Sequence, residues 1–437
     1  MSKKHVQWLY EELLTLVNQG VVSAETAERL YRHYGEKEQY SGRRWAVVLF
    51  GILGAALIGG GVILLLSHNW DQLSKPARTV LSFAPLMIAQ VLAGFVLLRR
   101  SDSTAWRESV GAGWALAIGA SIALVAQTYN ISGDFGRFML TWTLLGLAAV
   151  YLLQACLPAM LYLIGITVWT GHARWSHAHP AWFWLLAALL LPYVWRLFCK
   201  NRYQPRMALV NGVFAVCLCI ATGFTLEWNT PGLWILVYSA MLALLYSVGV
   251  RWFGDAPIFS RPPLQTVGGI GVIVLSLILT FEEPWLGYMH SYGRDLSHSL
   301  AGSPSELAVW VGLPILATLL CCWCVRHGKA WHMIFGALPA VATLGQFLAG
   351  THTGTLAATV VFDVYLVALG VTTMIVGLRS ERLSIVNIGM GILALLIITR
   401  FFDSELSFVA RGLAFIAVGC AFLITNIVLT RRKGAVR

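Results

Sequence analysis

The sequence predicts an all-α integral membrane protein, a polytopic bundle of about 14 transmembrane helices with the N-terminus and the C-terminus in the cytoplasm. The 437 residues are 58% hydrophobic and 12% charged, whereas a soluble domain is typically about 25% charged. Apolar runs long enough to cross a bilayer, roughly 20 residues, recur from end to end. The net charge of +11 does not indicate a nucleic-acid surface, because the basic residues are spread over short loops.

Hydropathy places the spans in a regular series. The fifth is the weakest, because it is short and almost continuous with the fourth. Losing or merging spans would give 12 or 13, so the count needs a second criterion. The spans are expected near residues 45–67, 79–98, 109–127, 138–156, 157–171, 181–199, 207–225, 231–250, 264–281, 306–325, 331–349, 355–378, 384–402 and 407–430.

The distribution of Lys and Arg supplies that criterion, since these residues concentrate in cytoplasmic loops. With the N-terminus inside, 24 of the 31 Lys and Arg residues fall in inward segments and 7 in outward ones. The bias holds in alternate loops along the whole chain, and one spurious span would destroy it. Fourteen spans with both ends inside is therefore the favoured arrangement.

The two ends of the chain are predicted to lie in the cytoplasm. Residues 1–44 are expected to form a short helical hairpin, 45–430 the transmembrane domain and 431–437 a basic tail. In the hairpin, Ser23 is placed to cap a second helix. The hairpin either packs on the inner membrane face or forms a docking surface for a protein partner.

The segment AQTYNISGDFGR, residues 126–137, is an unusually polar connection between two spans. Its Ser-Gly-Asp sequence is typical of a turn. One interpretation is a loop that satisfies its own backbone groups at the membrane surface. The other is that Gln127, Asn130 and Asp134 line an outward cavity together with Asp363.

Asp363 is the most informative residue, because it lies inside the long apolar run 355–378. A charged carboxylate there must face a cavity, pair with a cation or be protonated. We expect it to pair with Arg400 or Arg411, which flank the last outward turn with Asp403 between them. The pair is either a proton- or substrate-responsive site or a structural lock on the last three helices.

No motif indicates a catalytic, cofactor or metal site. The histidines at 172, 177 and 179 lack a metal-binding spacing, and the CCWC at 321–324 has no second cysteine pair. The glycine runs at 51–61 and 268–271 follow no strand, so they indicate close helix packing in lipid rather than phosphate binding. Five tryptophans near span ends are expected in an aromatic belt: Trp70, Trp175, Trp182, Trp228 and Trp285.

Four segments carry a resemblance to a known family: LLTLVNQGVVSAETAERLYRHY, HNWDQL, QTYNISGD and GLRSERLSIVNIGMGILALLIITRFFD. Together they resemble the bacterial membrane proteins of the "domain of unknown function 2157" family. The resemblance implies a polytopic inner-membrane protein. It brings no established reaction, substrate or cofactor.

Three functions stay open from the sequence. Many spans, very short loops and Asp363 favour a transporter or lipid-linked translocator. Outward loops rich in histidine favour a membrane-embedded enzyme acting at the outer face. The N-terminal hairpin favours a non-catalytic scaffold or sensor. Membrane lipids are expected partners, with a small-molecule or lipid-linked substrate for the first function, and the expected location is the bacterial inner membrane.

Overall fold

The computed structural model describes residues 70–176, 178–200, 202–225, 233–254, 263–286, 304–327, 330–350, 354–380 and 382–401, and scattered residues between 12 and 29 and between 409 and 419. Within these residues all regular structure is helical and no strand is present. The chain divides into two compact units, Met1–Arg78 and Thr79–Arg437. The predicted domain boundaries at residues 44 and 430 fall outside the described residues and stay predictions.

In the N-terminal unit, the described residues contain the predicted cap. The backbone N–H of Thr26 donates to Ser23 Oγ at 3.3 Å, the contact that a helix N-cap makes. Glu25 pairs with Arg29 one turn later at 2.7 Å. The capping role of Ser23 is therefore confirmed.

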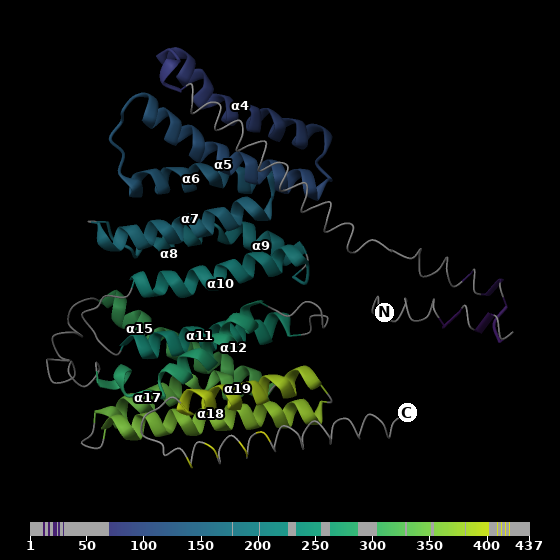
Figure 1. Ribbon diagram of the computed structural model, residues 1–437, viewed down its shortest axis with the longest axis vertical. Coiled ribbons are helices and arrows are strands. Elements are labelled where there is room, and N and C mark those ends of the chain that lie inside the picture. Colours follow the sequence, from purple (N-terminus) through teal and green to yellow (C-terminus); the bar gives the residue numbers. More distant parts are fainter. Residues whose placement is uncertain are drawn as a thin grey trace. The chain divides into compact units, whose positions relative to one another are not determined.

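Figure 1 labels the helices in the order in which they follow along the chain. The first is preceded by a single 3-10 turn, η1, at Trp70–Gln72. Their bounds are α4 Lys75–Arg99, α5 Thr104–Thr128, α6 Phe135–Leu153, α7 Cys156–Trp175, α8 Trp182–Ala188, α9 Leu191–Lys200, α10 Pro205–Thr225, α11 Leu233–Phe253, α12 Pro263–Ile278, α15 Pro304–Arg326, η2 Ala330–His332, α16 Met333–Gly336, α17 Leu338–Ala349, α18 Gly354–Arg379 and α19 Leu383–Phe401.

Ten stretches of the described chain are helical, long and apolar enough to cross a membrane. Two shorter apolar helices, Pro263–Ile278 and Val311–Arg326, accompany them. These twelve correspond to the predicted second to thirteenth spans. The predicted first and last spans, 45–67 and 407–430, are not covered by the described helices, so the count of 14 and the cytoplasmic placement of both ends stay predictions.

The surface of these helices is apolar, as lipid requires. On α4, Val80, Val91 and Leu98 are 70%, 69% and 85% exposed. A monomeric soluble protein rarely exposes large contiguous apolar patches. The protein is therefore a membrane protein with multiple apolar helices.

The weak fifth span is a full helix in its own right. Gln154 takes a left-handed conformation at the end of α6, with φ 51°, and Ala155 is extended before α7. These two residues stop one helix and start the next. The predicted range 157–171 was therefore too short, because α7 runs over 20 residues.

Two predicted spans contain breaks. The sixth consists of α8 and α9, which are separated just before Pro192. The eleventh consists of η2, α16 and α17, with its last break just before Pro339. Proline has no N–H for the helical hydrogen bond and clashes with the preceding turn, so a continuous helix is disfavoured at both points.

The described helices pack into connected groups. α5, α6 and α7 contact one another, and α7 continues onto α10 (Figure 1). α11 contacts α12, α15 and α17, and α18 lies between α17 and α19. α10 joins the two groups through α12. The segment 126–137, predicted to face outward, thus belongs to one group and Asp363 to the other.

Glycine sets the closest approaches, as the run at 268–271 predicted. A Cβ on Gly268 of α12 would lie 2.5 Å from the backbone nitrogen of Tyr246 in α11. Only glycine lets the two backbones come this close. The other predicted run, 51–61, lies outside the described residues.

The five tryptophans expected in an aromatic belt differ in burial, and the belt stays a prediction. Trp70 is 9% exposed, and Trp228 lies outside the described residues. Trp175 and Trp182 are 87% and 57% exposed, as residues at the membrane surface are. Trp285 is fully buried instead. Its indole N–H donates to the Leu279 carbonyl at 2.9 Å, so its polar group is satisfied within the protein and the ring packs in the core.

Candidate functional site

The ion pair predicted for Asp363 is present, and Arg400 is its partner. Arg400 Nη2 donates to Asp363 Oδ2 at 2.6 Å, and Arg400 Nε donates to Asp363 Oδ1 at 3.2 Å. The two-point contact matches the planar guanidinium to the planar carboxylate. Arg411 and Asp403, the other predicted members of this region, lie outside the described residues.

The pair also holds a third helix. Arg400 Nη2 donates to the Thr280 carbonyl at 2.8 Å, and Thr280 follows the end of α12. Asp363 lies about 13 Å from the start of α18 at about 1.5 Å per residue, and Arg400 is the next-to-last residue of α19. The pair therefore ties α12, α18 and α19 together at one end of these spans.

The surroundings of the pair are partly apolar and partly open. Phe362, next to Asp363, is fully buried and its ring lies 5.7 Å from that of Trp285. The side chains of Asp363 and Arg400 keep 29% and 24% exposure. An ion in an apolar environment is costly unless it is paired and hydrogen-bonded, which explains the reciprocal contacts. About a quarter of each side chain nevertheless remains exposed.

The segment 126–137 forms a capped turn. Asp134 is the N-cap of α6, and its Oδ2 accepts the Arg137 backbone N–H at 3.2 Å. His172 Nε2, in the last turn of α7, lies 3.3 Å from Asp134 Oδ1. Hydrogen bonding from the Gly136 backbone, with smaller contributions from Arg137 and His172, lowers the pKa of Asp134 below its ordinary value. The carboxylate thus stays charged at the positive end of α6.

Gln127 and Asn130 help to form this turn and are both exposed. Asn130 has φ 50°, a left-handed conformation that Asn tolerates well. Its N–H donates to the Gln127 carbonyl at 3.4 Å, and Ile131 N–H donates to the Ala126 carbonyl at 2.9 Å. Within the described chain, the structure brings Asp134 to His172 and Asp363 to Arg400. A cavity shared by these two groups stays a prediction.

No metal cluster is found in the part of the chain that the structure describes, where no three His, Cys, Asp or Glu side chains converge. His177 lies outside that part. Among the described residues, His172 and Asp134 form a two-residue contact.

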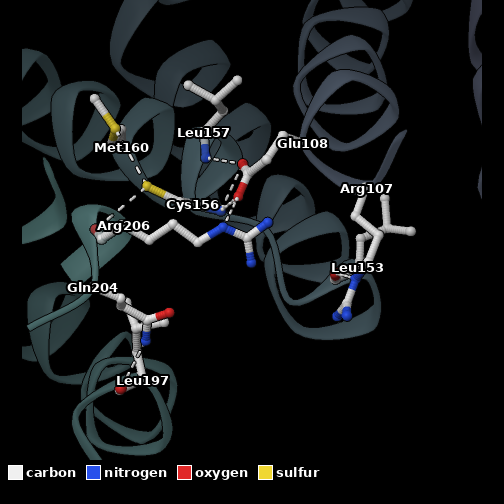
Figure 2. Close-up of polar contacts among 9 residues, drawn as sticks. All are labelled: Arg107, Glu108, Leu153, Cys156, Leu157, Met160, Leu197, Gln204 and Arg206. Carbon is white, nitrogen blue, oxygen red and sulfur yellow. Dashed lines mark hydrogen bonds and ion pairs between the residues drawn. The ribbon is translucent and has the colours of Figure 1, made fainter. Parts of the chain in front are cut away.

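A second polar cluster was missed by the sequence reasoning. Figure 2 shows Glu108 of α5 pointing at the start of α7, where its carboxylate accepts the backbone N–H groups of Cys156 and Leu157, each at 2.8 Å. Arg206, at the start of α10, places its Nε 3.3 Å from Glu108 Oε1. A carboxylate at a helix N-terminus satisfies free N–H groups and complements the helix dipole.

Arg107, the residue before Glu108, binds the C-terminal end of α6 in the same connection. Arg107 Nε donates to the Leu153 carbonyl, the last of that helix (Figure 2). A cation at a helix C-terminus is favourable for the same reason that an anion is favourable at the start. Arg107 and Glu108 therefore hold both ends of the α6–α7 connection, and Arg206 adds α10. We call these three residues the α5 clamp.

Two buried polar atoms at the α5 clamp have no hydrogen-bond partner among the described residues: Tyr193 Oη and Arg206 Nη2. Tyr193, on α9, is 1% exposed. Buried polar atoms are normally satisfied. Within the described residues, these two atoms therefore depart from the usual pattern.

The signal for the α5 clamp in the sequence is weak. Glu108 and Arg107 lie near the start of a span, where charged residues are ordinary. Their role depends on the α6–α7 connection 46 to 49 residues later. Asp363, by contrast, is conspicuous because its charge stands alone in an apolar run.

The comparisons with known proteins agree with the membrane class. No curated protein and no solved structure matches the chain. One family model does match, described as "Predicted membrane protein (DUF2157)", over residues 14–159. The matched range contains Glu108 and Asp134, whereas Arg206, Asp363 and Arg400 lie beyond it. Over residues 14–159 the chain is therefore similar to a family of predicted membrane proteins, as the first three resembling segments indicated. The fourth, at residues 377–403, lies beyond the match.

Proposed function

We propose that the protein is a transporter or lipid-linked translocator in which the Asp363–Arg400 pair responds to a proton or to a substrate. One observation carries this proposal: a two-point ion pair lies within membrane-crossing helices and keeps about a quarter of its surface exposed. Intramembrane ionisable residues commonly mark substrate, ion or proton pathways.

The chemistry of the pair suits such a role. Protonation of Asp363 would weaken its hold on the Arg400 guanidinium. An anionic group of a substrate would compete for the same guanidinium nitrogens. Either event would release the bond that ties α19 to α18, while the Thr280 carbonyl would keep Arg400 near α12. A change of charge at Asp363 would thus alter the contacts that join α12, α18 and α19.

The substitution Asp363→Asn tests the proposal, because it removes the charge and keeps the shape. Purified protein would be reconstituted into liposomes that contain a pH-sensitive dye and a fluorescently labelled phospholipid. We expect proton flux or lipid translocation above that of protein-free liposomes, and we expect Asp363→Asn to abolish it while the protein stays folded. No flux and no translocation by the unsubstituted protein would refute the proposal.

A charge-swapped control separates function from structure. Combining Asp363→Arg with Arg400→Asp restores an ion pair with the charges reversed. If the pair senses a proton or substrate, the double variant regains thermal stability but stays inactive. If the pair only locks the helices, stability and activity return together.

A scaffold or sensor is the alternative function. It is favoured by the completeness of the pair, in which both Asp363 oxygens are bound and Arg400 also satisfies a carbonyl. Loss of folded protein in Asp363→Asn would support it. Residues 1–44 would then be the contact with a protein partner, mostly outside the described residues.

An envelope enzyme has one specific observation in its favour, the contact of His172 with Asp134. A hydrolytic site would need a nucleophile beside this pair. We place the protein, for any of these functions, in the bacterial inner membrane with both ends in the cytoplasm. The excess of Lys and Arg in alternate loops supports this orientation.

A further inference from the structure

The outer surface of the bundle carries a groove between α7 and α10. It has a volume of about 560 Å³. On the α7 side it is lined by Ile164, Thr167, Val168 and Gly171. The Thr167 hydroxyl already donates to the Leu163 carbonyl at 2.8 Å, so this wall offers a ligand only apolar contact.

The α10 side is equally apolar and is open to the surrounding lipid. Val216 and Ile220 line the groove and are 48% and 46% exposed, and Val168 across the groove is 42% exposed. Phe224 forms part of the same wall near the end of α10. A ligand would therefore enter sideways from the bilayer, and it would be a hydrocarbon.

The dimensions fit one hydrocarbon chain. The α10 residues of the wall run from 212 to 224, which is about 18 Å at about 1.5 Å per residue. One leaflet occupies about half of a hydrocarbon core that is roughly 30 Å thick. A methylene group is about the size of a water molecule, roughly 30 Å³, so a groove of about 560 Å³ holds about 19 of them.

The helical repeat places a cation at one end of the groove. The lining positions on α7 follow the spacing of one helix face, and the next position on that face is Arg174. Arg174 lies in the last turn of α7. Trp175 follows it and is 87% exposed, as a residue at the lipid headgroup level is.

We propose that this groove binds one acyl chain of an anionic phospholipid, whose phosphate pairs with Arg174. The lipid belongs to the leaflet at the C-terminal end of α7. Apolar lining, leaflet-length depth and a terminal cation together select this ligand over a soluble molecule. The site lies on other helices than Asp363 and Arg400, so it stands independently of the transport proposal.

The test is photochemical cross-linking in liposomes. The full-length protein is reconstituted into phosphatidylcholine with a minor fraction of phosphatidylglycerol that carries a photoreactive group on its acyl chain. We expect the cross-linked peptides to come mainly from α7 and α10. Val216→Trp should reduce this labelling about tenfold, because the indole displaces at least two methylene groups of the chain.

Val274→Trp is the matched control. Val274 lies on α12, is 46% exposed and does not line the groove, so labelling of α7 and α10 should be unchanged. Arg174→Gln should remove the preference for phosphatidylglycerol over an equally photoreactive phosphatidylcholine. If Val216→Trp unfolds the protein, Ile220→Trp makes the same test from the next turn.

Three results would overturn the proposal. Labelling spread evenly over lipid-facing helices such as α4 would show only bulk lipid. Labelling that survives both groove-filling substitutions would place the chain elsewhere. A protein–protein adduct at α7 and α10 in place of the lipid adduct would show that a second copy fills the groove.

Discussion

Glu108 shows how one side chain can organise a connection between membrane helices. It accepts two backbone N–H groups at the start of α7 and forms an ion pair with Arg206 of α10. Only 14% of its side chain is exposed. Backbone groups in lipid have no water to bind, so their satisfaction by protein is worth more than at a wet surface.

The substitution Glu108→Ala should lower the free energy of unfolding by about 3 kcal/mol, because it leaves a partly buried guanidinium and two helix-end N–H groups without their partner. Thermal unfolding in detergent, followed by tryptophan fluorescence, measures this loss. Asp102→Asn is the control, because Asp102 is exposed in the turn that precedes α5 and a change there should stay within about 0.5 kcal/mol. Equal effects of the two substitutions would show that Glu108 holds nothing together.

The sequence identified one of the two polar centres at this scale. Asp363 was predictable because it is a lone charge within an apolar span. The sequence offered Arg400 or Arg411 as its partner, and the structure shows Arg400. The α5 clamp was not predictable, since Glu108 acts through the packing of α5 on α6 and α7. Gln127, Asn130 and Asp134 were predicted both as a turn and as part of a cavity, and the structure shows how the turn is built.

At the scale of elements, the close contact of α18 with α19 depends on glycines, which have no Cβ to keep the two backbones apart. A Cβ on Gly389 would lie 2.7 Å from both the Gly370 carbonyl oxygen and the Met374 nitrogen. A Cβ on Gly377 would lie 2.5 Å from the Val386 nitrogen. These two helices carry Asp363 and Arg400, so their spacing sets the geometry of the ion pair.

We expect Gly389→Ala to lower the unfolding free energy by about 1–3 kcal/mol, because the added methyl group forces the two backbones apart. Gly391→Ala on the same helix is the control. A Cβ there meets nothing within 4 Å, so the substitution should be neutral or stabilising by up to about 1 kcal/mol. Thermal unfolding of both variants makes the comparison, and equal melting temperatures would contradict the close approach.

The sequence predicted most elements but not their interruptions. Apolar runs located the described spans within a few residues. The helices on either side of the breaks before Pro192 and Pro339 were predicted as single spans. Hydropathy is averaged over a window of residues and does not detect that proline lacks the N–H of the helical hydrogen bond. The burial of Trp285 was also missed, since an aromatic residue near a span end fits both the belt and the core.

At the scale of the whole molecule, the account depends on the alternation of charge along the chain. Twelve apolar helices of the described residues follow the predicted order of spans. Their direction across the membrane is inferred from Lys and Arg in the loops. The predicted outward direction of the Asp363–Arg400 pair depends on this inference.

Cysteine accessibility in intact cells tests that orientation most directly. With the exposed Cys199 and Cys322 replaced by Ser, single cysteines are introduced at exposed positions at the two ends of the helices: Asn130→Cys, Gly350→Cys, Ser101→Cys and Ser380→Cys. The account predicts that a membrane-impermeant maleimide labels positions 130 and 350 from outside, and positions 101 and 380 only after the membrane is permeabilised. Labelling of 101 or 380 in intact cells, or protection of 130 and 350, would contradict the orientation and with it the outward-facing site.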